Sequence, residues 1–319
     1  MVRQPEPTQE DLECAQKVPQ AHPFSWTQAQ DLGLTRRQLM RLLELGLIRR
    51  PFKGVYVAAT LQDTMALRLE ILAMVVPPDC VVTDQTAGWL WAGDRVLAPN
   101  SHLATPALSV FCRPGHRLRS KLTTSGERRF LPRDLVEVRG LAVTSPLRTA
   151  CDLGRLLPRD QAFAALDSLA ATGSVTIDEL LVEVTRFKGF RGVVQLRAFA
   201  PLADPRSDSQ SESVLRLRWY DAGLPRPECQ VEAETPWGTT YQIDVGLRED
   251  KFGAEYFGEE FHGVDRREHD ERRLDWLRDV DDWTLVVARK NNVYGRQQDI
   301  VDILSATWRL AMAKRRRSA

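Results

Sequence analysis

The first regular hydrophobic pattern of the chain lies between residues 23 and 59. Thr27 is placed to begin one short helix that Gly33 ends, and Thr35 is placed to begin a second helix that Gly46 ends. Four apolar side chains in and after the second helix fall on one face and are expected to pack inward: Leu39, Leu42, Leu43 and Ile48. Residues 1–22 are polar, contain prolines and show no periodicity, so they predict a disordered leader.

A basic turn at Lys53-Gly54 leads into a β-branched run and predicts a hairpin after the second helix. Helix, turn, helix and hairpin follow one another in the order of a winged helix-turn-helix, in which the second helix enters the major groove and the wing touches phosphates. The pattern therefore predicts such a domain over residues 23–59.

Residues 60–202 alternate helical and strand-like segments and predict an α+β middle domain. Helices are expected at 65–76, 147–157, 159–172 and 176–187. Strands are expected at 107–119 and 136–146, and the stretch 79–93 predicts a strand that leads into a helix. The polar, Pro- and Ser-rich segment 203–211 predicts a linker.

The last part, 212–311, predicts the element order α-β-β-β-α-β-α, a small α/β domain. Its strands are expected at 229–235, 241–247, 252–258 and 283–289. The basic tail that follows at 312–319 is expected to be disordered rather than folded. The fold class expected for the whole chain is therefore mixed α/β: a winged helix, an α+β domain and a C-terminal α/β domain.

Composition predicts where the protein is located in the cell and argues against a disulfide framework. The chain has no run of eighteen apolar residues and no apolar segment near its N-terminus, which predicts a cytoplasmic protein without a membrane span or signal peptide. Its five cysteines stand singly and are odd in number, so neither a disulfide framework nor a zinc cluster is expected.

The net charge of +1 hides a polarised distribution. The segment from Gly33 to Tyr56 has six basic residues and one acidic residue. The segment from Asp250 to Asp282 has twelve acidic residues and six basic ones. Because basic residues occupy both the second helix and the hairpin, duplex DNA is the expected partner of the first part, although a merely solvated helix face stays possible. The six residues expected to contact DNA are Arg36, Arg37, Arg41, Arg49, Arg50 and Lys53.

Two carboxylates on neighbouring strands suggest a metal site. In the strand 241–247, alternation predicts that Asp244 leaves the apolar face formed by Tyr241, Ile243, Val245 and Leu247. Glu255 lies on the next strand. Two such carboxylates can hold Mg²⁺ or Mn²⁺, and a metal held in this way can activate water against a phosphodiester.

Three further residues have a functional and a structural interpretation each. Asp270 lies on the apolar face of its predicted helix, together with Leu274 and Leu277. Either a catalytic role or an ion pair with Arg273 would explain a charged residue at this inward position. His262 could orient a water or protonate a leaving oxygen, or be an ordinary surface residue. Glu212 fits a capping box beginning at Ser209 as well as a site.

The order of these residues resembles the family related to very-short-patch-repair endonucleases, a branch of the PD-(D/E)xK nuclease fold. That family has a helix glutamate, a strand aspartate, a Glu-x-Asp-Gly turn, a histidine and a helical Asp-x-x-Arg. The resemblance implies that Asp244 and Glu255 are metal ligands, with Glu212 as an auxiliary carboxylate. It also implies that His262 and Asp270 serve the water or leaving group, and that Arg273 contacts phosphate or orients Asp270.

The front half, roughly 24–190, resembles the abortive-infection type IV antitoxin family. The resemblance rests on Gly54-Val55-Tyr56-Val57 at the wing and on a Thr-Ser-Pro-x-Arg-Thr-x-x-Asp-Leu signature at Thr144–Leu153. It implies an operator-binding regulator with a cognate toxin protein as a further partner.

Phe257 departs from the nuclease pattern, because an apolar ring stands where that pattern has a polar group. Either Glu259, Glu260 or His262 takes over, or the pocket binds DNA or metal without cutting. Three hypotheses stay open: a Mg²⁺-dependent endonuclease, a non-catalytic antitoxin-type regulator that uses a degenerate nuclease fold as scaffold, and a module whose acidic face meets a basic toxin.

Overall fold

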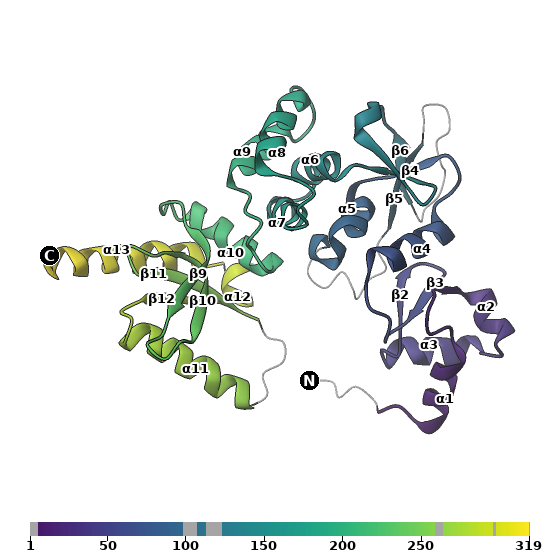
Figure 1. Cartoon of the computed structure of the whole chain (residues 1–319), viewed down its shortest axis with the longest axis horizontal. Helices are drawn as coiled ribbons and strands as arrows, with labels where there is room; N and C mark the ends of the chain where they lie inside the picture. Colours follow the sequence, from purple (N-terminus) through teal and green to yellow (C-terminus); the bar gives the residue numbers. More distant parts are fainter. Residues whose placement is uncertain (1–5, 98–106, 113–122, 259–263, 296–297, 319) are drawn as a thin grey trace. The chain divides into compact units, whose positions relative to one another are not determined.

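The computed structural model describes the chain except for residues 1–5, 98–106, 113–122, 259–263, 296–297 and 319 (Figure 1). The chain divides into two compact units, Met1–Leu153 and Gly154–Ala319. Helices and several small sheets occur in both units, which confirms the mixed α+β class. The predicted middle domain is not a unit of its own, because its strands fall in the first unit and its later helices in the second.

The first unit begins with the predicted helices and hairpin. A three-stranded antiparallel sheet in the order β1-β3-β2 accompanies them. Ser25, rather than Thr27, caps the first helix by accepting from Gln28 N, while Thr35 caps the second as predicted. The elements are β1 (Phe24–Ser25), α2 (Trp26–Asp31), α3 (Arg36–Glu44), β2 (Ile48–Phe52) and β3 (Val55–Ala58).

The N-terminal segment is not a disordered leader throughout, because residues Gln9–Lys17 form helix α1. Thr8 and Asp11 make a reciprocal capping box at its start. Cys14 and Val18 are buried in the same core as Leu39 and Leu42 of α3. The hydrophobic pattern does not reveal this helix, because a single buried side chain within nine residues leaves no visible period.

A five-stranded mixed sheet in the order β6-β5-β4-β8-β7 completes the first unit. Phe52 and Val55 of the wing lie in the same core as Val82 and Val110 of this sheet, and the Phe52 ring meets the Trp89 ring edge-on at 5.5 Å. The domain boundary expected at residue 59 therefore does not separate two hydrophobic cores. The elements are α4 (Met65–Val75), β4 (Cys80–Val82), α5 (Asp84–Ala92), β5 (Leu108–Cys112), β6 (Thr123–Glu127), β7 (Leu135–Val138), β8 (Leu141–Thr144) and α6 (Pro146–Leu156), the last of which contains the boundary between the units.

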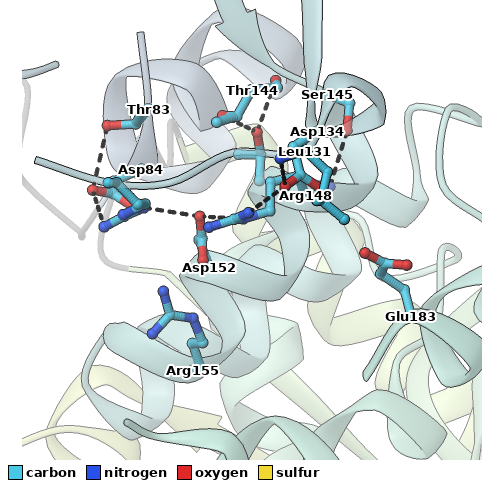
Figure 2. A network of polar contacts seen from close by, with 12 residues as sticks. Thr83, Asp84, Leu131, Asp134, Thr144, Ser145, Arg148, Asp152, Arg155 and Glu183 are labelled. Carbon is cyan, nitrogen blue, oxygen red and sulfur yellow. Dashed lines mark hydrogen bonds and ion pairs between the residues drawn. The ribbon is translucent and has the colours of Figure 1, made fainter. Parts of the chain in front are cut away.

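The Thr144–Leu153 signature forms a buried ion network (Figure 2). Arg148 donates to Asp134 at 2.7 Å and to Asp152 at 2.8 Å, and Arg128 bridges Asp152 and Asp84 at 2.8 and 2.9 Å. Asp152 is fully buried. The signature residues therefore have a structural role, since they bind the start of α6 to the sheet that precedes it.

The second unit combines a small helical part with a four-stranded sheet. The sheet has the order β12-β11-β10-β9, in which β9, β10 and β11 are antiparallel and β12 is parallel to β11. The predicted order α-β-β-β-α-β-α is confirmed, with the short α12 added before the last helix. The elements are α7 (Arg159–Ala170), α8 (Ile177–Val184), α9 (Val193–Phe199), α10 (Gln210–Asp221), β9 (Glu228–Glu234), β10 (Thr240–Leu247), β11 (Phe252–Phe257), α11 (Val264–Asp279), β12 (Thr284–Arg289), α12 (Lys290–Val293) and α13 (Ile300–Ser318).

The predicted linker 203–211 is packed rather than free. Asp204 and Ser207 are buried, and Asp204 N donates to Asp167 Oδ1 at 2.9 Å. On α10, Arg216 Nη2 holds both oxygens of the same Asp167 carboxylate, at 2.7 and 2.6 Å. Helix α7 is therefore joined to α10 of the C-terminal α/β part, which the polar composition of the connecting segment concealed.

The predicted basic tail is also helical. Helix α13 continues through Ser318 and includes the basic run Arg315–Arg317 in its last turn, where cations are favoured by the helix dipole. Arg315 donates to Asp250 at 3.1 Å. The expectation of a disordered tail at 312–319 is therefore wrong for the residues that the structure describes.

Replacing Arg216 by Ala leaves the buried Asp167 carboxylate without its cation. We expect the free energy of unfolding of the second unit to fall by about 3–5 kcal/mol, measured by urea denaturation followed by circular dichroism. The control is Lys314→Ala, whose side chain is 79% exposed and 3.8 Å from Asp282. That variant should lose less than about 1 kcal/mol, and equal losses in the two variants would contradict the role given to Arg216.

Candidate functional site

Three carboxylates gather where the pairing of β10 with β11 ends, each from a different element. Glu212 lies in the first turn of α10, Asp244 lies in β10 and Glu255 lies in β11. The charges of Glu212 and Glu255 both act on Asp244, which places the three groups in one electrostatic site. The predicted combination of Glu212, Asp244 and Glu255 is therefore brought together by the fold.

The backbone and the side chain of Glu212 have different partners. Its backbone N–H donates to Ser209 Oγ at 3.2 Å, which begins the helix. Its side chain does not close the capping box on Ser209 N, but accepts from Asp208 N and from Gln230 Nε2, both at 2.8 Å. The carboxylate is thus held between the helix start and strand β9.

Asp244 lies at a break in the pleat of β10. The neighbouring residues Ile243 and Val245 pair with Val231 and Cys229 of β9, whereas Asp244 and Gln230 are not Cα partners. Gln230 has a left-handed φ of +51°. The regular alternation predicted for this strand is therefore interrupted at Asp244.

The break divides the apolar residues of β10 between two cores. Tyr241 and Ile243 pack with Leu277 of α11, while Val245 and Leu247 pack on the α10 and α13 side. The prediction that these four residues share one face is wrong, because it assumed an unbroken strand. Its conclusion for Asp244 still holds, since Asp244 Oδ2 accepts from Tyr256 N at 2.7 Å and the side chain belongs to neither core.

The pKa of Asp244 is raised to about 8. Burial is the largest cause, followed by the negative charge of Glu212, and Glu255 adds to it. The Tyr256 N–H and the Arg273 guanidinium act in the opposite direction. Burial also raises the pKa of Glu212, against the hydrogen bonds from Ser209, Asp208 and Gln230. Asp244 therefore holds a proton at neutral pH, because its ionised form would be buried beside two other carboxylates.

Arg273 of α11 binds Glu255 with both guanidinium nitrogens. Nη1 donates to Oε1 at 2.9 Å and Nη2 donates to Oε2 at 2.6 Å, and Glu255 is 2% exposed. Nη1 also donates to Gln242 O at 2.9 Å. Arg273 therefore pairs with a carboxylate on the sheet, where a bidentate fork suits a buried group. The side chain of Asp270, the local partner expected for Arg273, lies outside the described residues.

The remaining predicted residues are only partly placed. His262, Glu259 and Glu260 lie outside the described residues. Asp270 lies in α11, but its side chain is also outside what the structure describes. Phe257 ends β11 opposite Arg289 of β12 and is half-buried.

The donor set fits a divalent ion with few protein ligands. Within the described residues, no three His, Cys, Asp or Glu side chains are arranged to hold a metal ion. Mg²⁺ often takes only one or two carboxylates and keeps several waters, however. An uncompensated carboxylate with a pKa of about 8 beside two others is a place where a divalent cation would relieve repulsion. Asp244 and Glu255 could hold such an ion, with Glu212 beside them.

The expected DNA-contacting residues divide into two groups. Arg36, Arg37, Arg50 and Lys53 are exposed. Arg41 is half-buried with its Nε 3.6 Å from Asp11 of α1, and Arg49 Nη2 donates to Leu61 O at 2.6 Å. Arg41 and Arg49 therefore serve the fold, whereas Arg36, Arg37 and Lys53 are exposed on α3 and at the hairpin turn.

Gln230 and Asp11 were missed by the sequence analysis. Gln230 supports Glu212 from a left-handed backbone position that gives no sequence signal at a non-glycine residue. Asp11 had a sequence signal, because Thr8 stands three residues before it and the two residues together form a helix-start pattern.

Two mycobacterial proteins are similar to most of the chain. They are uncharacterized protein Rv2248 of Mycobacterium tuberculosis strain H37Rv and uncharacterized protein MT2308 of strain CDC 1551, each 30% identical over 254 residues, 79% of this chain and 89% of the relative. The chain belongs to their family. No family model matches the chain. Among the helices that the structure describes, none is long and apolar enough to cross a bilayer.

The raised pKa of Asp244 makes stability depend on pH. Because the folded-state pKa of about 8 exceeds the ordinary 3.8, the folded protein holds an extra proton between these values, and stability is lost as pH rises through about 8. Asp244→Asn mimics the protonated form, so its stability relative to wild type should increase from pH 5 to pH 9 by a few kcal/mol, on the order of one per pKa unit. Urea denaturation in EDTA measures it.

The matched control is Glu232→Gln, which removes an exposed carboxylate from neighbouring strand β9. Its stability relative to wild type should stay level over the same range. A level difference for Asp244→Asn as well would show that the Asp244 carboxylate titrates normally.

Proposed function

We propose that this protein binds duplex DNA through its winged helix and hydrolyses phosphodiester bonds with a Mg²⁺- or Mn²⁺-dependent C-terminal domain. The observation that carries the proposal is the cluster of Glu212, Asp244 and Glu255, in which the pKa of Asp244 is raised to about 8. Structural carboxylates are usually neutralised by a cation, and strongly perturbed groups gather at functional sites.

The architecture of the C-terminal part supports the nuclease proposal. One helix, three antiparallel strands, a second helix and a parallel fourth strand follow the order expected from the PD-(D/E)xK resemblance. The carboxylates come from the central strands β10 and β11 and from the preceding helix α10. Fold likeness alone does not establish an activity, so the proposal depends on the carboxylates.

The proposal gives the residues of the site separate roles in ion binding and catalysis. Asp244 and Glu255 would hold the ion, which supplies an activated water and stabilises charge on the phosphate. Arg273 holds Glu255 in place through two hydrogen bonds, and Glu212 adds negative charge that strengthens cation binding. Asp244 would release its proton from Oδ1 or Oδ2 as a cation arrives. His262 and Asp270 remain the proposed residues for the water or leaving group.

The exposed arginines of α3 support the DNA-binding part of the proposal. Arg36 and Arg37 lie in the first turn of the helix that a winged helix-turn-helix places in the major groove, and Lys53 is exposed at the hairpin turn. Phosphate contacts from both elements would make affinity strongly dependent on salt.

A non-catalytic regulator is the second candidate, and a specific contact favours it. Both oxygens of Glu255 are held by Arg273, and Phe257 is apolar. A carboxylate engaged in this way has less capacity for a metal ion. In this case the winged helix would bind an operator, and the C-terminal part would act as a scaffold or as a surface for a toxin partner.

Cleavage assays test the catalytic proposal. The purified full chain should cut at least one of duplex, mismatched or single-stranded DNA with Mg²⁺ or Mn²⁺, and EDTA should stop it. Asp244→Asn should reduce the rate by at least about a hundredfold, because the metal contributes several kcal/mol to the transition state. Glu232→Gln on β9 should cut as wild type does.

Metal-binding and DNA-binding measurements distinguish the nuclease from the non-catalytic regulator. If wild type cuts none of these substrates, and calorimetry detects no Mg²⁺ or Mn²⁺ binding that Asp244→Asn abolishes, the nuclease proposal fails. Retained sequence-specific DNA binding in the same preparation would then favour the regulator.

Salt titration of DNA affinity tests the winged helix. The double variant Arg36→Ala/Arg37→Ala should bind more weakly and flatten the slope of log K against log salt by about two, roughly one per lost phosphate contact. Arg197→Ala, which removes an exposed arginine from α9, serves as the charge-matched control and should leave the slope unchanged. An unaltered slope in the double variant would place the DNA contact on another surface.

A further inference from the structure

Two cysteines of the first unit face each other inside its five-stranded sheet. Cys80 of β4 and Cys112 of β5 are Cα partners across an antiparallel strand pair. Their Sγ atoms are 2.9 Å apart, and the residues are 6% and 3% exposed. Both are free thiols in the structure.

The hydrogen-bond pattern of β4 and β5 explains why the thiols are so close. Thr83 N donates to Ser109 O at 3.0 Å, so this opposed pair is a hydrogen-bonded one. Pairs alternate along an antiparallel ladder, which makes Cys80 and Cys112, three steps away, a non-hydrogen-bonded pair. Side chains approach more closely at such pairs, and Cys80 N bonds instead to Pro77 O at 3.4 Å.

We propose that Cys80 and Cys112 form a reversible disulfide when the protein meets a hydroperoxide. Neither strand needs to shift register, because the sulfurs already face each other at 2.9 Å, against about 2.05 Å in a disulfide bond. From the sequence no disulfide framework is expected, because the five cysteines stand singly and are odd in number. The pairing of residues 32 positions apart arises only in the folded sheet.

The reaction with hydrogen peroxide is balanced as follows. One thiolate attacks a peroxide oxygen, the O–O bond breaks, and a sulfenic acid forms as the leaving hydroxide takes up the thiol proton to become water. The second sulfur then attacks the sulfenic sulfur, its S–H proton joins the departing hydroxide, and a second water leaves. The two thiols lose two electrons and two protons, and the peroxide takes up both and is reduced to two waters. A dithiol reductant reverses the change by thiol–disulfide exchange.

Burial determines the rate of this reaction. It raises the pKa of Cys80 to about 12, and the neighbouring Cys112 adds to the shift, so little thiolate is present at neutral pH. Oxidation is therefore slow and requires a local opening of the sheet. Once formed, the bond closes a loop that includes residues 81–111 and stabilises the first unit by restricting its unfolded state.

Peptide mapping of the oxidised full chain tests the pairing. The protein is incubated with hydrogen peroxide, denatured, alkylated with iodoacetamide and digested with trypsin, which cuts after Arg68, Arg95 and Arg117. We expect peptide 69–95 joined to peptide 96–117, two hydrogens lighter than their sum, and separate alkylated peptides after dithiothreitol. Oxidation should also raise Tm by about 5–10 °C, reversibly.

Single variants provide the controls. Cys80→Ala and Cys112→Ala should each abolish the joined peptide and the rise in Tm, whereas Cys14→Ala, which removes a buried cysteine of α1, should leave both unchanged. Because the joined peptide is sought in wild type, the test does not depend on how well a variant folds. Recovery of both peptides fully alkylated after oxidation, or of Cys80 joined to another cysteine, would overturn the proposal.

Discussion

The ion pair between Arg216 and Asp167 is the contact on which the C-terminal site depends. It lies fully inside the second unit, where an unpaired charge would be strongly unfavourable, and so it fixes α10 against α7. Because α10 carries Glu212 in its first turn, the same contact sets where that carboxylate meets β9 and the sheet. The segment 203–211 is held by the same aspartate, which explains why a polar, Pro-containing stretch is packed instead of free.

The buried carboxylates of the two units differ in how fully neighbouring cations compensate them. In the first unit, Arg128 and Arg148 satisfy Asp84, Asp134 and Asp152, and the network stabilises the start of α6. At the end of the β10–β11 pair, Arg273 satisfies Glu255, but burial and two neighbouring carboxylates still raise the pKa of Asp244. That imbalance is the physical basis for proposing a cation site there.

The N-terminal surface shows the same distinction among arginines. Arg41 and Arg49 are used by the fold, through Asp11 and the Leu61 carbonyl. Arg36 and Arg37 extend from the first turn of α3 into solvent. A count of basic residues along the chain could not separate these groups, because the partner of Arg41 lies in a helix that the sequence pattern did not reveal.

The sequence by itself determined the order and type of most elements, the cap at Thr35, the inward face of α3 and the presence of Asp244 and Glu255 on adjacent strands. These features depend on interactions within a few residues, which periodicity and capping chemistry express directly. Only the tertiary structure decided that Arg273 binds Glu255, that the pleat breaks at Asp244, that α7 joins α10 and that Cys80 meets Cys112. Arg273 and Glu255 are 18 positions apart in the sequence, Arg216 and Asp167 are 49 apart, and Cys80 and Cys112 are 32 apart. No local sequence pattern encodes contacts over such separations. Burial and the competition among several possible charge partners select them once the elements pack.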